Sequence, residues 1–504
     1  MPDMRHNLLT EPVFSVQWPE GKEARITLPE VLAHLGNGAP IEFAALQAHQ
    51  MHAWHAFLVQ LAAIALHHAG EGTTTRNAES WRGLLRTLTE DRDEPWCLVV
   101  DDLSQPAFMQ PPVPEGSLAK WNAIACPDEM DLLVTAKNHD LKTQRIGSAR
   151  PEHWAYALIS LQTMEGFGGS KNYGIARMNG GYGNRPCIAV SSDARWATRF
   201  VRDVQLLLAE RSAILSRYGY QPIGGHALLW LVSWDGESSL HLTRCDPFFV
   251  EVCRRVRLVP DGTAVVARTT GSAAQRLTAK DRKGDLGDLW TPIRRTDGAA
   301  FGYKDVSYET MQEVLFGSDW TPSPASQPQP EDGDAPLLIA QVLGRGQGRT
   351  EGLHERLIPV PPKARRLFGT PDGRERLGKL SKQRVELVAT VRAKVLFPAL
   401  KQLTETPSPF TRALDEHVDT IFFERLFDDV DREPGEASRD FTRRVLHIAR
   451  EILCEAIESV PLPAVRRYRA ISAAEGIFEG TARKRFPDVH NVKGEDTDDR
   501  AVCP

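Results

Sequence analysis

Residues Gly166–Arg185 read GFGGSKNYGIARMNGGYGNR, and seven of them are glycine. The basic residues of this stretch are Lys171, Arg177 and Arg185. Glycine makes positive φ accessible and leaves no side chain to hold the backbone away from a partner. Bare backbone N–H groups beside cations favour an anionic partner such as a phosphate. A helical pattern precedes the stretch and a short strand pattern follows it, which predicts a loop anchored at both ends.

The composition is that of an ordinary globular protein. The chain has 504 residues and a formal net charge of −5, so it has room for several domains but no uniformly basic coat, and any nucleic-acid surface must be local. Its seven cysteines are irregularly spaced. Together with the absence of a signal-peptide pattern, this spacing predicts a protein of the reducing cytoplasm. The longest apolar run, 56–66, is too short to span a bilayer.

The patterns predict an α+β protein with two structured domains. Residues 1–360 alternate short strand and helix patterns, which indicates a large mixed α/β domain, and the Pro-rich segment 320–336 is typical of a linker. Residues 361–487 carry four amphipathic patterns joined by short turns, which predicts a four-helix bundle. The first of these helices should kink at Pro398. The polar tail 488–504 is expected to be disordered.

Two further segments concentrate basic residues. A strand pattern leads into the turn Gly344–Arg349, which carries Arg345, Arg349 and a central Gln347 that could insert into a nucleic-acid groove, although most such turns are only tight turns. The segment Lys363–Lys401 holds eleven Lys or Arg against three acidic residues. Such a run is either a solvated helix face or a contact to phosphates.

Two enzymatic readings remain as alternatives. A nucleotide- or phosphate-dependent enzyme could use the Gly166 loop, but Lys171 stands where a dinucleotide fingerprint needs its third glycine. A metal-dependent nuclease could use His49, His52 and His55, which recur at three-residue steps without an acidic or cysteine ligand beside them. We therefore expect neither a metal, nor a cofactor, nor catalysis.

An ordered set of short motifs resembles the CasA family, the large subunit of the type I-E CRISPR Cascade complex. The set comprises Asn7–Leu9, Pro106–Gln110, Lys137–Asp140, Gly166–Gly169 and Gly346–Gly348, and it spans nearly the whole chain. The resemblance implies a non-enzymatic protein that recognises a short protospacer-adjacent motif in double-stranded DNA and helps to open the duplex. It further implies that the partners are guide RNA held in the complex, other Cascade subunits and a helicase-nuclease, with no membrane.

The resemblance also implies roles for individual positions. A glycine loop that enters the minor groove would correspond to Gly166, Phe167, Gly168 and Gly169. A glutamine wedge that separates the first base pairs would be Gln347, flanked by Gly346 and Gly348. A basic finger would be one of Lys280, Arg282 and Lys283, and the motif region would also be touched by Lys137, Asn138 and His139. Phosphates would be held by Lys171, Arg177, Lys379, Lys382 and Arg384. Some family members bind zinc near the position of Cys245, but the scattered cysteines here do not support a zinc site.

Overall fold

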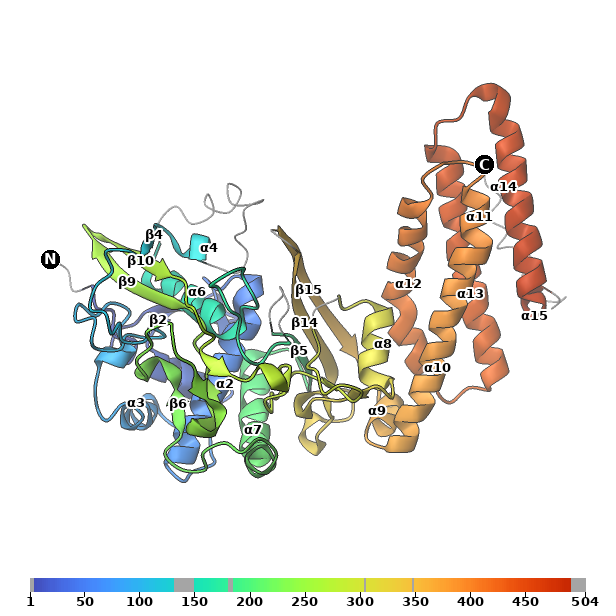
Figure 1. The fold of residues 1–504 in the computed structure, drawn as a ribbon. Helices are drawn as coiled ribbons and strands as arrows, with labels where there is room; N and C mark the ends of the chain where they lie inside the picture. The colour runs from blue at the N-terminus through green and yellow to red at the C-terminus, as the bar shows by residue number, and fades with distance from the viewer. Residues whose placement is uncertain (1–3, 131–148, 180–184, 303–304, 347–348, 491–504) are drawn as a thin grey trace. The chain divides into compact units, whose positions relative to one another are not determined.

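The computed structural model describes residues 4–130, 149–179, 185–302, 305–346 and 349–490, and the chain forms two compact units (Figure 1). The first unit comprises Met1–Val306 and Thr321–Leu357, and the second comprises Ser307–Trp320 and Ile358–Pro504. Helices and strands mix in the first unit and the second is helical, which confirms the predicted α+β class.

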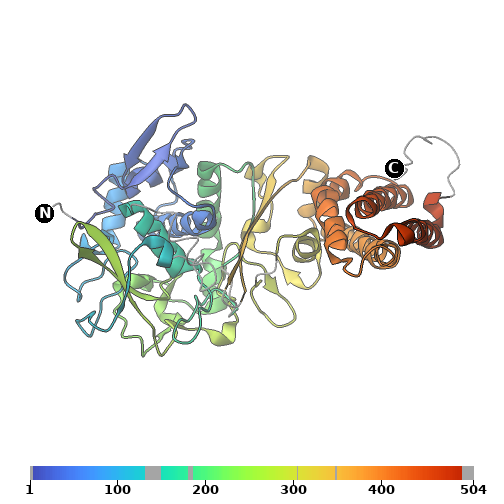
Figure 2. The same ribbon diagram turned by 90° about the horizontal axis from the view of Figure 1, so that it is seen from above.

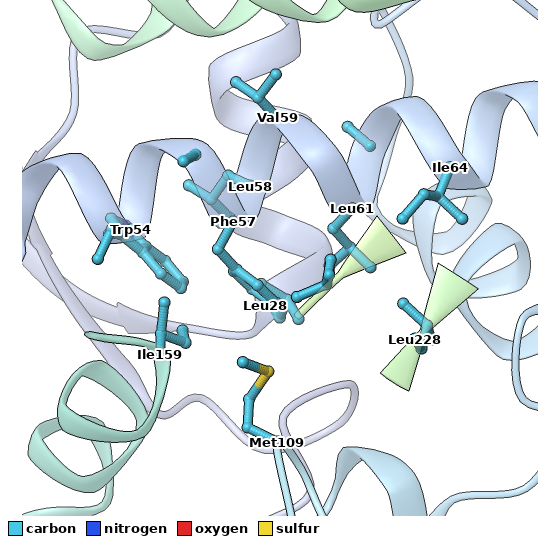
Figure 3. Packing of buried hydrophobic residues seen from close by; sticks show 14 of the residues in the cluster. Leu28, Trp54, Phe57, Leu58, Val59, Leu61, Ile64, Met109, Ile159 and Leu228 are labelled. Carbon is cyan, nitrogen blue, oxygen red and sulfur yellow. The ribbon is translucent and has the colours of Figure 1, made fainter. Parts of the chain in front are cut away.

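The core of the first unit surrounds helix α2, Met51–His68. Every residue from His52 to Leu66 is buried, which is expected of a helix that is apolar on all sides. Helices α6 (Pro151–Met164) and α7 (Trp196–Tyr218) pack against α2. Figure 3 shows Trp54, Phe57 and Leu61 of α2 facing side chains from other segments of the unit, including Ile159, Met109 and Leu228.

The amino-terminal part of the first unit covers this core with a small antiparallel sheet. Its strands are β1 (Phe14–Gln17), β2 (Glu23–Ile26) and β3 (Glu42–Phe43), in the order β2-β1-β3. Helix α1, Leu28–Gly36, begins with a capping box in which Thr27 and Glu30 satisfy each other's backbone N–H groups. Helix α3 spans Ala78–Thr87, and the short helix α4 spans Pro127–Met130.

Two further three-stranded sheets follow, and the second contains the strands on either side of the second glycine-rich turn. One has the order β4-β10-β9 and contains Asn122–Ile124, Ala264–Thr270 and Arg255–Asp261. The other has the order β15-β14-β5 and contains Arg349–Pro359, Leu337–Gly346 and Cys187–Ser191. The remaining short strands are β6 (His226–Leu228), β7 (Leu240–His241), β8 (Cys245–Val250), β11 (Leu277–Thr278), β12 (Ile293–Arg294) and β13 (Trp320–Thr321).

The Pro-rich segment 320–336, predicted to be linker-like, forms a packed loop in the structure. Ala325 and Ser326 are almost completely buried. The Arg202 side chain of α7 binds Asp332 with Nε to Oδ1 at 2.6 Å, and it donates to the Gln327 carbonyl at 2.9 Å. Proline also lowers the conformational entropy that ordering the segment removes, so the composition is compatible with a packed loop.

The second unit contains four long helical segments at the positions where the sequence predicts them. The first runs through α10 (Pro371–Thr390), a π-helical turn (Val391–Leu396) and α11 (Phe397–Leu400). The others are α12 (Ser408–Asp428), α13 (Pro434–Ser459) and α14 (Ala464–Arg485), and Figure 2 shows these helices packed side by side. The shorter helices are α8 (Tyr308–Phe316), α9 (Pro362–Phe368) and α15 (Pro487–His490).

The π-helical turn is the local response to Pro398. Proline has no N–H to donate, and its ring collides with the carbonyl four residues earlier. Widening the preceding turn at Val391–Leu396 relieves this collision without breaking the helix. At the carboxyl end, Asp488 lies in α15 rather than in a disordered tail, whereas 491–504 lie outside the described residues. None of the described helices is long and apolar enough to cross a membrane.

Candidate nucleic-acid interface

The amino-terminal half of the glycine-rich stretch forms a closed loop directly after α6. The Gly168 N–H donates to the Asn172 carbonyl at 2.8 Å, and the Asn172 N–H donates to the Gly169 carbonyl at 3.0 Å. The base of the loop is closed by the Ile175 N–H, which donates to the Glu165 carbonyl at 2.9 Å. Gly168 and Ser170–Asn172 are exposed, so the tip of this loop is available to a partner.

The glycines of this loop are required for different reasons. Gly169 has φ +113°, a backbone conformation that residues with a side chain rarely adopt. At Gly168, a Cβ atom would lie 3.2 Å from a nitrogen of the Arg254 guanidinium and 3.3 Å from the Asn172 Cβ. At Gly174, a Cβ atom would lie 2.5 Å from the Gly166 carbonyl carbon. The tight loop therefore depends on missing side chains at three positions.

Lys171 projects from the tip of the loop. Its φ is +66°, a left-handed conformation that costs a non-glycine residue about 1 kcal/mol and is found mainly where the surroundings enforce it. The Ser272 N–H donates to the Lys171 carbonyl at 2.9 Å, and a Cβ atom at Gly271 would lie 2.6 Å from the Lys171 Cβ. The ammonium group is exposed and has no ion-pair partner among the described residues.

The two arginines of the stretch face inward, so the prediction that Arg177 binds a phosphate is wrong for this conformation. The Arg177 guanidinium stacks on the Phe249 ring, donates to the Phe249 carbonyl at 3.0 Å and pairs with Glu251 at 3.6 Å. Burial raises the pKa of Glu251 to about 7, an effect that the Arg177 charge opposes. Arg185 is likewise buried and makes a two-pronged ion pair with Asp288. A buried guanidinium that is already paired cannot reach a DNA backbone.

The structure places the candidate finger against the glycine-rich stretch. Lys280 and Arg282 lie in an exposed single turn, and neither side chain has a hydrogen bond or ion pair among the described residues. Lys283 is held back, because its Nζ donates to the Asp297 carbonyl at 3.1 Å. A Cβ atom at Gly284 would lie 2.7 Å from the Met178 carbonyl carbon, so the backbones of the two segments are in contact. The cations that remain available in the finger are therefore Lys280 and Arg282.

Other expected contacts lie in the second glycine-rich turn, 344–349, and in the segment 137–139. Strand β14 includes Arg345 and ends at Gly346, and strand β15 begins at Arg349. Gln347 and Gly348 lie outside the described residues, as do Lys137, Asn138 and His139.

Two of the three cations of the second unit that were expected to contact phosphates are paired with carboxylates of the protein. The Arg384 guanidinium is buried over the Phe441 ring and pairs with Asp429 at 2.5 Å, so its predicted place on an exposed basic face is wrong. Lys379 is exposed but pairs with Glu375 at 2.6 Å. Of the three residues in this segment proposed for phosphate contact, Lys382 alone is exposed without a partner among the described residues.

The histidines near the start of α2 belong to the interior of the first unit. The His55 Nε2 lies 2.8 Å from Asp203 Oδ2, which also accepts from the Trp290 Nε1 at 2.8 Å. Burial opposes ionisation of Asp203, but these hydrogen bonds and the Arg202 charge outweigh it and hold its pKa at about 2. His52 is buried against the edge of Trp290, and burial lowers its pKa well below the usual range. Within the described ranges, no three His, Cys, Asp or Glu side chains gather to hold a metal ion.

Sequence reasoning missed the residues that hold the exposed loops in place. The Arg254 side chain donates a hydrogen bond to the Gly166 carbonyl of the glycine loop, Gly166–Gly174. Asp285, which follows the finger residues Lys280–Lys283, accepts hydrogen bonds from Arg217 at 2.7 Å and from the Tyr218 hydroxyl. A usable signal was present for Arg254, because Glu251 and Arg254 interrupt an apolar strand pattern between Phe248 and Val259. Charged residues inside such a pattern require buried partners.

Comparison with solved structures identifies the fold. Neither a family model nor a curated protein matches the sequence. Thermus thermophilus CasA (Cse1) aligns with a TM-score of 0.65 and 16% sequence identity, covering 95% of this chain and 100% of that chain. Cse1 from Acidimicrobium ferrooxidans gives 0.63 and 15%, covering 96% and 100%. Thermobifida fusca Cse1 gives 0.65 and 13%, covering 95% and 98%.

These matches define the class first: the chain has the fold of CRISPR-associated proteins. Within that class, the fold is that of CasA, also named Cse1, over nearly the whole length of both chains. The resemblance to the CasA family drawn from short motifs in the sequence is thereby confirmed.

Proposed function

We propose that this chain is the non-catalytic large subunit of an RNA-guided surveillance complex of the type I-E Cascade kind, acting in the cytoplasm. In this role it recognises a short motif in double-stranded DNA, helps to open the duplex and recruits a helicase-nuclease. The observation that carries the proposal is the tip Gly168–Asn172, which is largely exposed and whose backbone is fixed by hydrogen bonds, in a stretch that also contacts, at Met178, the segment carrying the exposed Lys280 and Arg282. The CasA fold supports it.

The geometry of the tip suits a narrow groove. Minor-groove base edges carry a degenerate pattern of acceptors, so readout there depends on close approach and on groove shape. A tip with glycine at 168 and 169 allows such an approach, and Lys171 adds a cation where the phosphates of both strands converge. Lys280 and Arg282 supply further cations for the same duplex.

The opening step rests on the second glycine-rich turn. Gln347 stands between Gly346 and Gly348 in the sequence, and in this proposal its side chain inserts between base pairs. Unstacking one step costs a few kcal/mol, which the growing RNA–DNA heteroduplex offsets. In this proposal the guide RNA and the other Cascade subunits hold the separated target strand.

The geometry of the loop disfavours the alternative of a nucleotide-dependent enzyme. Phosphate sites of that kind lie at the amino-terminal end of a helix, where N–H groups and the helix dipole attract negative charge. Here the loop follows the carboxyl end of α6 at Met164, and strand β5 is the next described element after the stretch. The carboxyl end of α6 offers carbonyl groups rather than the free N–H groups that such a nucleotide site uses.

The proposal is tested with the complex reconstituted around guide RNA, with and without this chain. Binding to a duplex library with a randomised triplet beside the target should become selective for a subset of triplets only when the chain is present. A Gly168→Leu, Gly169→Leu variant should assemble normally but lose this selectivity. Gln347→Ala should keep initial binding and slow duplex opening. Binding that ignores both the chain and the triplet would refute the proposal.

A further inference from the structure

The side chain of Arg254 lies directly beneath the glycine loop. Its guanidinium donates to the Gly166 carbonyl at 3.0 Å and pairs with the Glu165 carboxylate at 3.1 Å. The same nitrogen would lie 3.2 Å from a Cβ atom at Gly168. Arg254 is 8% exposed, so these contacts are shielded from water and are strong. The Arg254 side chain thus contacts the loop at Gly166 and also lies close to Gly168.

The backbone around Arg254 is itself held by Gln162 of α6. The Gln162 side-chain oxygen accepts from the N–H groups of Cys253 and Arg254, both at 2.8 Å. Its amide nitrogen donates to the Arg254 carbonyl at 3.0 Å and to the Met109 carbonyl at 2.9 Å. The full hydrogen-bonding capacity of this buried amide is therefore used.

This arrangement gives the segment Pro106–Gln110 a structural role that its sequence alone does not reveal. Met109 is fully buried with φ +60°, in a turn closed by paired hydrogen bonds between Ala107 and Gln110. Its carbonyl is thereby aimed at Gln162. A continuous series of buried hydrogen bonds runs from this turn through Gln162 and Arg254 to Gly166.

We propose that Arg254 is a positioning residue for DNA-motif recognition, which holds the glycine loop in its binding conformation before DNA arrives. The inference rests on the proposed function. A glycine-rich tip has high conformational freedom, and ordering it on binding would weaken affinity unless the protein orders it in advance. Arg254 does not contact DNA itself, since it is buried and its charge is paired with Glu165.

Arg257 provides a matched control. It lies on β9 three residues further along, is completely buried, and donates to the main-chain carbonyls of Gln105, Val100 and Asp102. Arg254→Gln and Arg257→Gln therefore remove the same charge from the same region, but only the first removes a contact to the glycine loop. The double variant Glu165→Gln, Arg254→Gln also removes that contact while leaving the net charge unchanged.

The experiment measures three quantities for the parent chain and each variant. These are the melting temperature of the chain, amide hydrogen exchange across 166–173, and the ratio of affinities of the reconstituted complex for duplexes with and without the selected triplet. Both Arg254 variants should exchange faster at Gly168 and Asn172 and lose about tenfold in the affinity ratio. Arg257→Gln should lower the melting temperature and leave the ratio unchanged.

Gly168→Ala adds a test of direct contact. The methyl group that Gly168→Ala introduces crowds the Arg254 guanidinium. The effect of this substitution on the affinity ratio should therefore be smaller in an Arg254→Ala background and unchanged in an Arg257→Gln background. An unchanged ratio in the Arg254 variants, or an equal loss in Arg257→Gln, would overturn the positioning role. A parent complex that ignores the triplet would instead refute the proposed function, and the two failures are therefore distinct.

Discussion

The glycine loop and the start of the helical unit looked alike as basic segments, and in each the structure pairs some cations while leaving another, Lys171 or Lys382, exposed without a partner among the described residues. In the first region, Lys171 is exposed and unpaired among the described residues, while Arg177 is buried against Glu251. In the second, Arg384 is buried with Asp429 and Lys379 is paired at the surface. The comparison teaches that a local excess of positive charge does not make a phosphate-binding surface. What counts is which cations the protein leaves without a partner.

The largest expected effect tests whether Arg384 is structural. Arg384→Ala removes one of the two partners of the buried Asp429, leaving Arg432, and also removes the stacking on Phe441, so the helical unit should lose about 3 kcal/mol of unfolding free energy. Denaturant unfolding of the chain measures the loss. Lys382→Ala, at an exposed position of the same helix, should stay within about 0.5 kcal/mol. Equal losses of unfolding free energy in the two variants would show that the buried Arg384 contributes no more to stability than the exposed Lys382.

A smaller effect concerns acid sensitivity of the first unit, whose interior also holds a paired carboxylate. The pKa of Asp203 is about 2, below its ordinary value of 3.8, so the unfolded chain takes up this proton more readily than the folded chain. The stabilisation is present above pH 4 and should be lost as the pH falls from about 4 towards 2, a change of about 2 kcal/mol. The free energy of unfolding, measured across this pH range, should change less with pH for Asp203→Asn than for the parent. The same dependence of stability on pH in both proteins would contradict the lowered pKa of Asp203.

The smallest expected effect compares two exposed lysines. Lys171→Gln removes an unpaired cation, so the slope of log affinity against log salt for duplex binding should fall by about 0.9 in magnitude. Lys379→Gln should change this slope less, because Glu375 already neutralises that cation. Titrations of the reconstituted complex at several salt concentrations measure both slopes. A larger change for Lys379 would reverse the comparison between the two regions.

Sequence periodicity predicted the helices well, because the pattern of buried residues along a helix repeats within a few positions. The four carboxyl-terminal patterns within 361–487 correspond to α10–α11, α12, α13 and α14. Each of these helices is encoded by apolar residues three and four positions apart, so no information from distant segments is needed.

The candidate site was less predictable because its decisive contacts are non-local. The burial of Arg177 depends on Glu251, and the fixing of Gly166 depends on Arg254, each many residues further along the chain. The composition of 320–336 resembles that of a linker, yet Asp332 is held by Arg202 on α7. The order of glycine-rich loops could be read from the sequence, but which cations remain free could not, since ion pairing is decided by the tertiary fold.

The path of the chain between the two units also governs how the protein can be divided. Helix α8 belongs to the helical unit, but the chain then returns to the first unit for Thr321–Leu357 before it enters the helical unit for good. A single cut after Leu357 therefore releases a carboxyl-terminal fragment without Tyr308, whose ring lies against Phe422 in the helical unit. The complementary fragment keeps α8 with its apolar side uncovered. Expression of either half alone should therefore yield an incomplete core, and a faithful dissection must graft 307–320 onto the helical fragment.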